Sequence, residues 1–349
     1  MGCSDAKAMN PRRSARSTVT FVATTPAFVE CAGTRRFCGT PSKVAVVATQ
    51  PVRSLRDVPH VRESSVRAGE LEVTYFECGN GPLALCLHGF PDSPHTWRHL
   101  LPALAAAGYR AVAPFMRGYA PTSIPPSGVY QTAALARDAN ALHQALGGDE
   151  HAVIIGHDWG APTVCGAAID APPRWSKVVS MAVPPGPALG AAFVSNLAQI
   201  QRSWYMFFFQ HGLSNHVVAA NDLAFIDMLW SQWSPGFAAD ADLEHVKSAL
   251  RDTNNLQAAL GYYRATLGDG KRDPELSALQ QRMGGEYPSQ PLLYLHGADD
   301  GCVGREVAQA ASAMSPANVQ YEFVADAGHF MQLEQPQRVN ELIVDFVAR

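Results

Sequence analysis

The sequence has no apolar run long enough to cross a membrane. A spanning helix would need about 18 consecutive apolar residues without charges, and the 349 residues contain no such run and no compact apolar core of a secretory signal near the N-terminus. The seven cysteines are odd in number and scattered, with no C-x-x-C pair that would indicate a zinc or redox site. We therefore expect a cytoplasmic protein with reduced thiols and with neither a metal nor an organic cofactor.

The charge is distributed unevenly. The net charge is −4, but residues 1–65 carry ten Lys or Arg against four acids, whereas the rest of the chain carries 17 against 27. This acidic remainder contains no basic stripe with interleaved aromatics, which argues against nucleic acid as a partner. An anionic ligand would gain nothing from its overall field. We expect a small neutral or apolar substrate, and the sequence leaves a homodimer open.

Residues 1–65 differ from the rest in composition. They are rich in Ser, Thr, Arg, Ala and Pro, poor in acids, and show no sustained period of 2 or 3.6 residues. This composition predicts a disordered or leader-like extension. An organelle transit peptide and upstream sequence translated from a misassigned start both fit this bias.

From residue 66 the pattern becomes that of an α/β protein. Apolar runs predict strands at 71–76, 83–87, 110–114, 152–155, 291–295 and 319–324, and 3.6-residue periods predict helices at 96–107, 131–146, 305–313 and 335–347. Uninterrupted apolar runs are typical of parallel strands that are covered on both faces. The alternation predicts a doubly wound, mostly parallel sheet built from residues 66–184 and 287–349.

Between residues 185 and 286 the alternation stops. This segment is helical and rich in aromatics, including the run 204–209 and the later Trp230 and Trp233. An insertion of this kind between two strands would form a cap over the carboxyl ends of the strands, where open α/β sheets hold their sites.

The sharpest motif is Gly156-His157-Asp158-Trp159-Gly160. It follows a buried strand and precedes a helical run, and it has the shape of the G-x-S-x-G nucleophile elbow, with Asp at the serine position. The competing interpretation is that Asp158 only caps the next helix, since Asp is a favoured N-cap residue.

Several further motifs occur in order along the chain. They are His88-Gly89-Phe90-Pro91, Trp97-Arg98, Arg117-Gly118-Tyr119, the Asp158 elbow, Tyr205, Tyr263-Arg264, Asp300 and Gly328-His329. With these motifs, the chain from about residue 68 to its end resembles the epoxide hydrolase branch of the α/β-hydrolase fold. One departure is the segment Met116 to Ala120, where the family commonly has an acid before the motif and a glycine at its end; this affects loop packing more than chemistry.

The resemblance implies a catalytic triad in the order nucleophile, acid, histidine. Asp158, Asp300 and His329 fill these roles, each just past a predicted strand. Asp299 is the alternative acid; the resemblance favours Asp300. The alternative for His329 is a loop histidine with no catalytic role.

An aspartate nucleophile restricts the chemistry. Its carboxylate, with a reference pKa near 3.9, is already ionised at neutral pH and attacks without a base. Attack on a carboxylic ester or amide would give a high-energy anhydride, so the favoured electrophile is a saturated carbon with a leaving group, as in an epoxide or alkyl halide. The resulting ester then needs water activated by His329, which Asp300 orients. The backbone N–H groups of Phe90 and Trp159 are the expected oxyanion hole.

The leaving group separates the two substrate classes. Tyr205 and Tyr263 match the paired cap tyrosines of epoxide hydrolases, which would hold the epoxide oxygen. Tyr262 is the alternative to Tyr263, and both phenols could instead be lid packing.

An indole at the position of Trp159 also serves halide binding in haloalkane dehalogenases, but Phe90 stands where those enzymes have an asparagine. The leading hypothesis is an epoxide hydrolase, then a haloalkane dehalogenase, then a non-catalytic binding protein of the same fold. The residues expected to bind the substrate are His88, Phe90, Trp159, Phe208 and Trp230.

Overall fold

A computed structural model describes residues 53–349 of the chain. Most of the predicted N-terminal extension lies outside the described residues. Residues 53–65, however, contain the 3-10 helix η1 (Leu55–Asp57) and the start of strand β1 (Arg62–Ala68). Regular secondary structure is therefore present before residue 66. Strand β1 escaped prediction because it is an edge strand with a mostly exposed, polar sequence.

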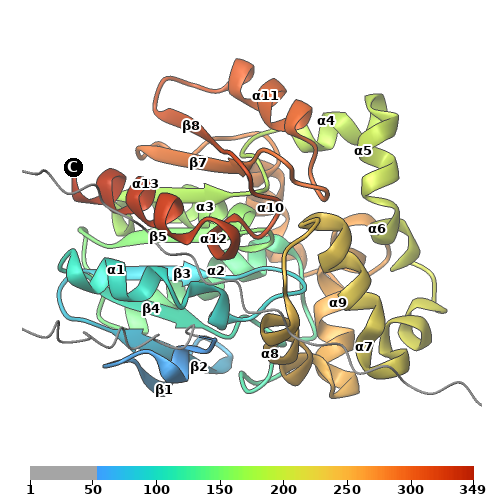
Figure 1. Ribbon diagram of the computed structural model, residues 1–349, viewed down its shortest axis with the longest axis horizontal. Helices are drawn as coiled ribbons and strands as arrows, with labels where there is room; N and C mark the ends of the chain where they lie inside the picture. The colour runs from blue at the N-terminus through green and yellow to red at the C-terminus, as the bar shows by residue number, and fades with distance from the viewer. Residues whose placement is uncertain (1–52) are drawn as a thin grey trace, which may run out of the picture. The chain divides into compact units, whose positions relative to one another are not determined.

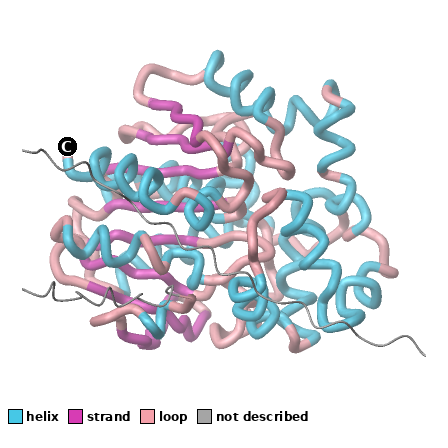
Figure 2. The backbone as a smooth tube through the Cα atoms, viewed as in Figure 1, coloured by secondary structure: helices cyan, strands magenta, loops and turns pink. Residues whose placement is uncertain are grey.

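The core is one eight-stranded sheet (Figures 1 and 2). Its order is β1-β2-β4-β3-β5-β6-β7-β8, with β1 and β2 antiparallel to their neighbours and the other strands parallel. This confirms the predicted doubly wound, mostly parallel sheet. After β1, the strands are β2 (Leu71–Cys78), β3 (Leu83–Leu87), β4 (Arg110–Pro114), β5 (Val153–His157), β6 (Lys177–Met181), β7 (Leu292–Gly297) and β8 (Val319–Val324).

Helices cover both faces of this sheet. Figure 1 shows α1 and α13 in front of the strands and α2 and α3 behind them. The central strands β3 and β5 are buried along their whole length, as their apolar runs require. The helices and 3-10 turns of the core are η2 (Pro94–Trp97), α1 (Leu100–Ala106), α2 (Thr132–Ala145), α3 (Gly160–Asp170), η3 (Pro172–Arg174), α11 (Arg305–Met314), α12 (Met331–Glu334) and α13 (Pro336–Ala348).

The long connection from β6 to β7 is helical. Figure 1 shows α7, α8 and α9 grouped beside the sheet rather than on either face. Helix α7 is broken where Ala220 to Leu223 leave the helical conformation. The elements of this insertion are α4 (Ala188–Ser195), α5 (Leu197–Arg202), α6 (Trp204–Phe208), α7 (Ser214–Trp233), α8 (Asp240–Leu250), α9 (Thr253–Leu267), η4 (Pro274–Leu276) and α10 (Ser277–Met283).

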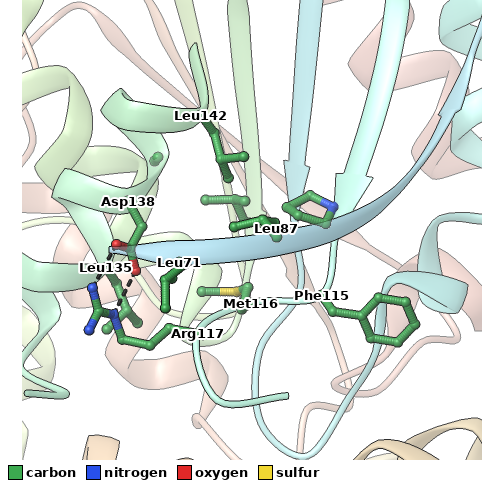
Figure 3. A pocket seen from close by; sticks show the side chains of 11 residues that line it. Leu71, Leu87, Phe115, Met116, Arg117, Leu135, Asp138 and Leu142 are labelled. Atoms are coloured by element: carbon green, nitrogen blue, oxygen red, sulfur yellow. Dashed lines mark hydrogen bonds and ion pairs between the residues drawn. The ribbon is translucent and has the colours of Figure 1, made fainter. Parts of the chain in front are cut away.

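A buried ion pair joins the loop after β4 to α2 (Figure 3). The Arg117 guanidinium donates two hydrogen bonds to the Asp138 carboxylate, at 2.6 and 2.7 Å, and a third to Glu70 at 2.7 Å. The adjoining cavity has a volume of about 20 Å³ and is lined mostly by apolar side chains. It is far too small for an organic substrate, so this region is structural.

Candidate active site

The elbow at the end of β5 has the strained backbone expected of a nucleophile turn. Asp158 has a φ of +51°, a conformation that costs a non-glycine residue about 1–3 kcal/mol. The flanking glycines are required by space: a Cβ at Gly156 would collide with the carbonyl of Gly160, and a Cβ at Gly160 would collide with the carbonyl of Leu87. The motif therefore holds the Asp158 side chain above the strand ends.

The sheet order brings the three predicted triad residues together. The loops that follow β5, β7 and β8 carry Asp158, Asp300 and His329, and all of these strands are parallel. His329 Nδ1 lies 2.9 Å from Asp300 Oδ2, and His329 Nε2 lies 3.5 Å from Asp158 Oδ2. All three side chains are buried. This is the linear arrangement of acid, histidine and nucleophile that triad chemistry uses.

The two carboxylates control the protonation of His329. Burial alone would lower the pKa of the imidazole, but the negative charges of Asp300 and Asp158 outweigh burial and raise the pKa of His329 to about 10. Burial would raise the pKa of Asp300, but its pairing with His329 holds that pKa below the usual value. Both carboxylates therefore favour the protonated form of His329.

Removing the Asp158 charge should change this protonation. We expect Asp158→Asn to lower the pKa of His329 from about 10, because one of the two negative charges that stabilise the imidazolium is lost. A pH titration of the imidazole resonances by NMR measures the shift, and the spectrum of His329→Gln identifies the resonance. An unchanged or higher pKa would show that Asp158 does not act on His329.

Asp299 is the sequence alternative for the acid, and the geometry separates it from Asp300. Asp299 is exposed, whereas Asp300 is buried and its second oxygen accepts hydrogen bonds from the backbone N–H groups of Cys302 and Val303, at 2.7 and 3.0 Å. The contact with His329 is made by Asp300, so the geometry favours Asp300 over Asp299.

The predicted oxyanion hole lies where β3 ends beside β5. The N–H of Phe90 donates a 2.7 Å hydrogen bond to Asp158 Oδ1. A Cβ at Gly89 would collide with both the Asp158 carboxylate and the backbone nitrogen of Trp159. Gly89 thus lets the loop approach both the nucleophile and the backbone nitrogen of Trp159 closely.

The two predicted cap tyrosines meet above the nucleophile. Tyr205 from α6 and Tyr263 from α9 are buried, and their ring centroids are 5.7 Å apart. The Tyr263 hydroxyl lies close to Trp159 and Tyr205 but has no hydrogen bond of normal length to any residue in 53–349. Burial raises the pKa of both phenols well above 10, so both remain protonated donors at neutral pH.

Tyr262, the alternative to Tyr263, faces another partner. Its hydroxyl donates a 2.6 Å hydrogen bond to the carbonyl of Arg117. A phenol with this strong backbone bond has no proton to offer to a substrate at Asp158, so the geometry favours Tyr263.

Three of the residues predicted to bind the substrate make other contacts in the structure. The two ring nitrogens of His88 interact with the backbone of Gly89 and Met116. The Trp230 indole donates a hydrogen bond to the carbonyl of Pro91 and stacks on Phe330. Phe208 stacks on Phe225 within the cap. Of the five predicted substrate-binding residues, only Trp159 lines the cavity at Asp158; Phe90, like these three and like Tyr205, does not line it. The sequence pointed to His88, Trp230 and Phe208 because they are polar or aromatic. In the structure their side chains contact the backbone or other aromatic rings.

Sequence reasoning missed two groups at the site. Ser234 and Glu334 hold the histidine loop: Ser234 Oγ donates to Glu334 at 2.7 Å and accepts from the N–H of Phe330 at 3.1 Å. Cys302 comes within 4.8 Å of both the Asp158 carboxylate and His329. Its position two residues after the predicted acid was the available signal.

A large cavity opens at the nucleophile. It has a volume of about 540 Å³, within the range of sites for drug-sized ligands. Asp158, Trp159 and Tyr263 line one end. The cavity continues along α4 and α9 to exposed residues such as Leu267.

Comparison with known proteins identifies the fold family. The family described as alpha/beta hydrolase fold matches residues 82–336. The chain therefore belongs to the α/β-hydrolase fold family and is a hydrolase, as the sequence predicted. In the described residues, no helix combines the length and apolar character of a membrane span.

Its relatives include members of the epoxide hydrolase branch, which confirms the resemblance seen in the sequence. Epoxide hydrolase A of Mycobacterium tuberculosis is 27% identical over 333 residues, covering 85% of this chain and 98% of the relative. The AB hydrolase superfamily protein YfhM of Bacillus subtilis is 29% identical over 272 residues, covering 77% and 91%. The crystal structure of a putative epoxide hydrolase from Klebsiella pneumoniae superposes with a TM-score of 0.73 at 26% identity, covering 82% and 98%.

Proposed function

We propose that this enzyme opens an epoxide with water to give a vicinal diol, through a covalent ester on Asp158. The observation that carries the proposal is the pairing of a buried carboxylate with two protonated phenols on the cap side of the same site. A nucleophile that attacks carbon and donors that receive an oxygen are the two requirements of epoxide opening.

In the first step, a carboxylate oxygen of Asp158 attacks an epoxide carbon and the ring C–O bond breaks. The released oxygen takes a proton from Tyr205 or Tyr263, whose hydroxyls have weak partners or none in the described part of the chain. The weakness of these contacts favours the substrate oxygen as acceptor. The product is an alkyl ester of Asp158 with a free hydroxyl on the neighbouring carbon.

Ester formation also lowers the pKa of His329, the base of the second step. When Asp158 becomes a neutral ester, the imidazolium loses one of the two charges that raise its pKa, so His329 gives up its proton and the phenolate is reprotonated. Neutral His329 then removes a proton from water as the water attacks the ester carbonyl. The N–H groups of Phe90 and Trp159 stabilise the oxyanion, and collapse of the intermediate releases the diol and the Asp158 carboxylate.

A substrate panel tests the proposal. The full chain is incubated with small epoxides and, separately, with small haloalkanes, and diol and halide release are measured beside the Asp158→Asn variant. We expect diol from epoxides, no halide release, and no activity in the variant. Halide release would replace the proposed function by dehalogenation, and equal diol formation by Asp158→Asn would remove Asp158 as the nucleophile.

A further inference from the structure

The cavity at Asp158 is larger than a small epoxide needs. Its volume of about 540 Å³ extends from the nucleophile past Pro162 and Leu189 to Met206 and Leu267. The walls along this path are mostly apolar side chains, with a proline-rich segment at 184–187. An epoxide bound at Asp158 would therefore place a substituent of considerable length along α4 and α9.

The charges along this path are of one sign. Among the described residues that line the cavity, none is Lys, Arg or His, and the two acids are Asp158 at the buried end and Glu286 at the exposed end. The Arg282 guanidinium near the mouth is engaged by Glu286, with Nε 3.0 Å from Oε2. A carboxylate at the end of the substituent would lie near Glu286 and would find no cation among the residues that line the cavity.

We infer that this enzyme selects uncharged epoxides with an extended apolar arm and discriminates against arms that end in a carboxylate. The inference rests on the proposed function and narrows its substrate class. The arm contributes binding energy by leaving water, and each buried methylene should raise kcat/KM about threefold to fourfold until the cavity is filled.

Four terminal epoxides test the substrate class. They share the reacting end and carry a short alkyl arm, a long alkyl arm, a long arm with a terminal carboxylate, or the methyl ester of that carboxylate. We expect the long alkyl and methyl ester substrates to exceed the short one, and the carboxylate to fall at least about tenfold below its ester. Equal kcat/KM for acid and ester, or no dependence on arm length, would overturn the inference. Lack of turnover for all four would overturn the proposed function and the inference with it.

Two tryptophan substitutions on α4 test where the arm lies. Leu189 lines the cavity, whereas Val194 on the same helix is 87% exposed and does not line it. Leu189→Trp should reduce kcat/KM for the long-arm epoxide at least about tenfold more than for the short one, because the added ring fills the path. Val194→Trp should leave the ratio unchanged. An equal loss on both substrates with Leu189→Trp would place the arm elsewhere.

A separate observation concerns the thiol behind Tyr205. Cys302 is buried, its Sγ lies 3.4 Å from the Tyr205 hydroxyl, and Tyr263 is the other side chain that interacts with this hydroxyl. A thiol is a weak donor and a weak acceptor, so it can orient the phenol without competing with a substrate oxygen. We propose that Cys302 is a positioning residue that directs the Tyr205 proton toward the epoxide.

A double-mutant cycle separates positioning from packing. We expect Cys302→Val to slow ester formation about fivefold in single-turnover experiments, the effect of one lost hydrogen bond, while ester hydrolysis is unchanged. Cys302→Ser should restore the rate. In the Tyr205→Phe background, Cys302→Val should have no further effect. An equal slowing in that background would overturn the positioning role, and an unaltered rate in Tyr205→Phe alone would instead remove Tyr205 from the proposed function.

Discussion

His329→Gln should make the covalent ester on Asp158 accumulate. Asp158 still attacks the epoxide in this variant, but the ester persists because no base remains to activate water at its carbonyl. We expect turnover to fall by about 10²–10⁴-fold. Intact mass spectrometry should show a protein heavier by the mass of one whole epoxide, and peptide mapping should locate the added mass on Asp158.

Two controls make the trapping experiment decisive. Asp158→Asn combined with His329→Gln should show no adduct, because the amide is a poor nucleophile. Exposure to haloalkanes tests the alternative chemistry, in which an alkyl adduct without halogen would form on Asp158. An epoxide adduct on another residue, or an unmodified His329→Gln protein that still turns over normally, would contradict the account.

The cap phenols should be required for the first step and dispensable for the second. We expect Tyr205→Phe combined with Tyr263→Phe to slow ester formation by about 10²–10⁴-fold, because the epoxide oxygen would leave as an unassisted alkoxide. Each single variant should keep part of the rate, since one donor remains. Rapid acid quenching followed by mass spectrometry measures ester formation directly.

Tyr262→Phe is the matched control for the phenols. It removes a hydroxyl from the same helix, but that hydroxyl is bonded to the carbonyl of Arg117. Ester formation should therefore stay close to the normal rate, with some loss of stability from the unpaired carbonyl. Near-normal ester formation in the double phenylalanine variant would remove both phenols from the mechanism.

The sequence predicted the parts of this protein that local patterns determine. The strands β3, β4 and β8 occur at the residues where the sequence predicted them, although β8 is only partly buried. The Asp158 elbow was recognisable because a strained strand-to-helix turn needs glycines at fixed spacing. Because β5, β7 and β8 are parallel, the loops that follow them lie at the same edge of the sheet, and this brings Asp158, Asp300 and His329 together.

The features that the sequence did not predict depend on contacts between segments that are distant in the chain. Strand β1 is exposed and polar, so backbone pairing with β2 rather than a hydrophobic pattern defines it. The contact of Cys302 with Tyr205 joins the end of β7 to the cap. In the same way, His88 looked available in the sequence, but both ring nitrogens are occupied by backbone groups.

The protonation of His329 links the two steps of the proposed mechanism. A free site with a pKa of about 10 at this histidine holds its proton at neutral pH, and the loss of the Asp158 charge on ester formation releases it. The base thus becomes available when an ester exists to be hydrolysed. This order of events follows from the position of one imidazole between two carboxylates.

A single turnover in oxygen-18 water, with enzyme in excess over epoxide, tests the role of Asp158 most directly. The account predicts that the first diol contains no label, because its new oxygen comes from Asp158, and that one labelled oxygen is found in the Asp158 carboxylate. Label in the first diol, with none in the protein, would mean that water attacks the epoxide directly and would contradict the covalent mechanism.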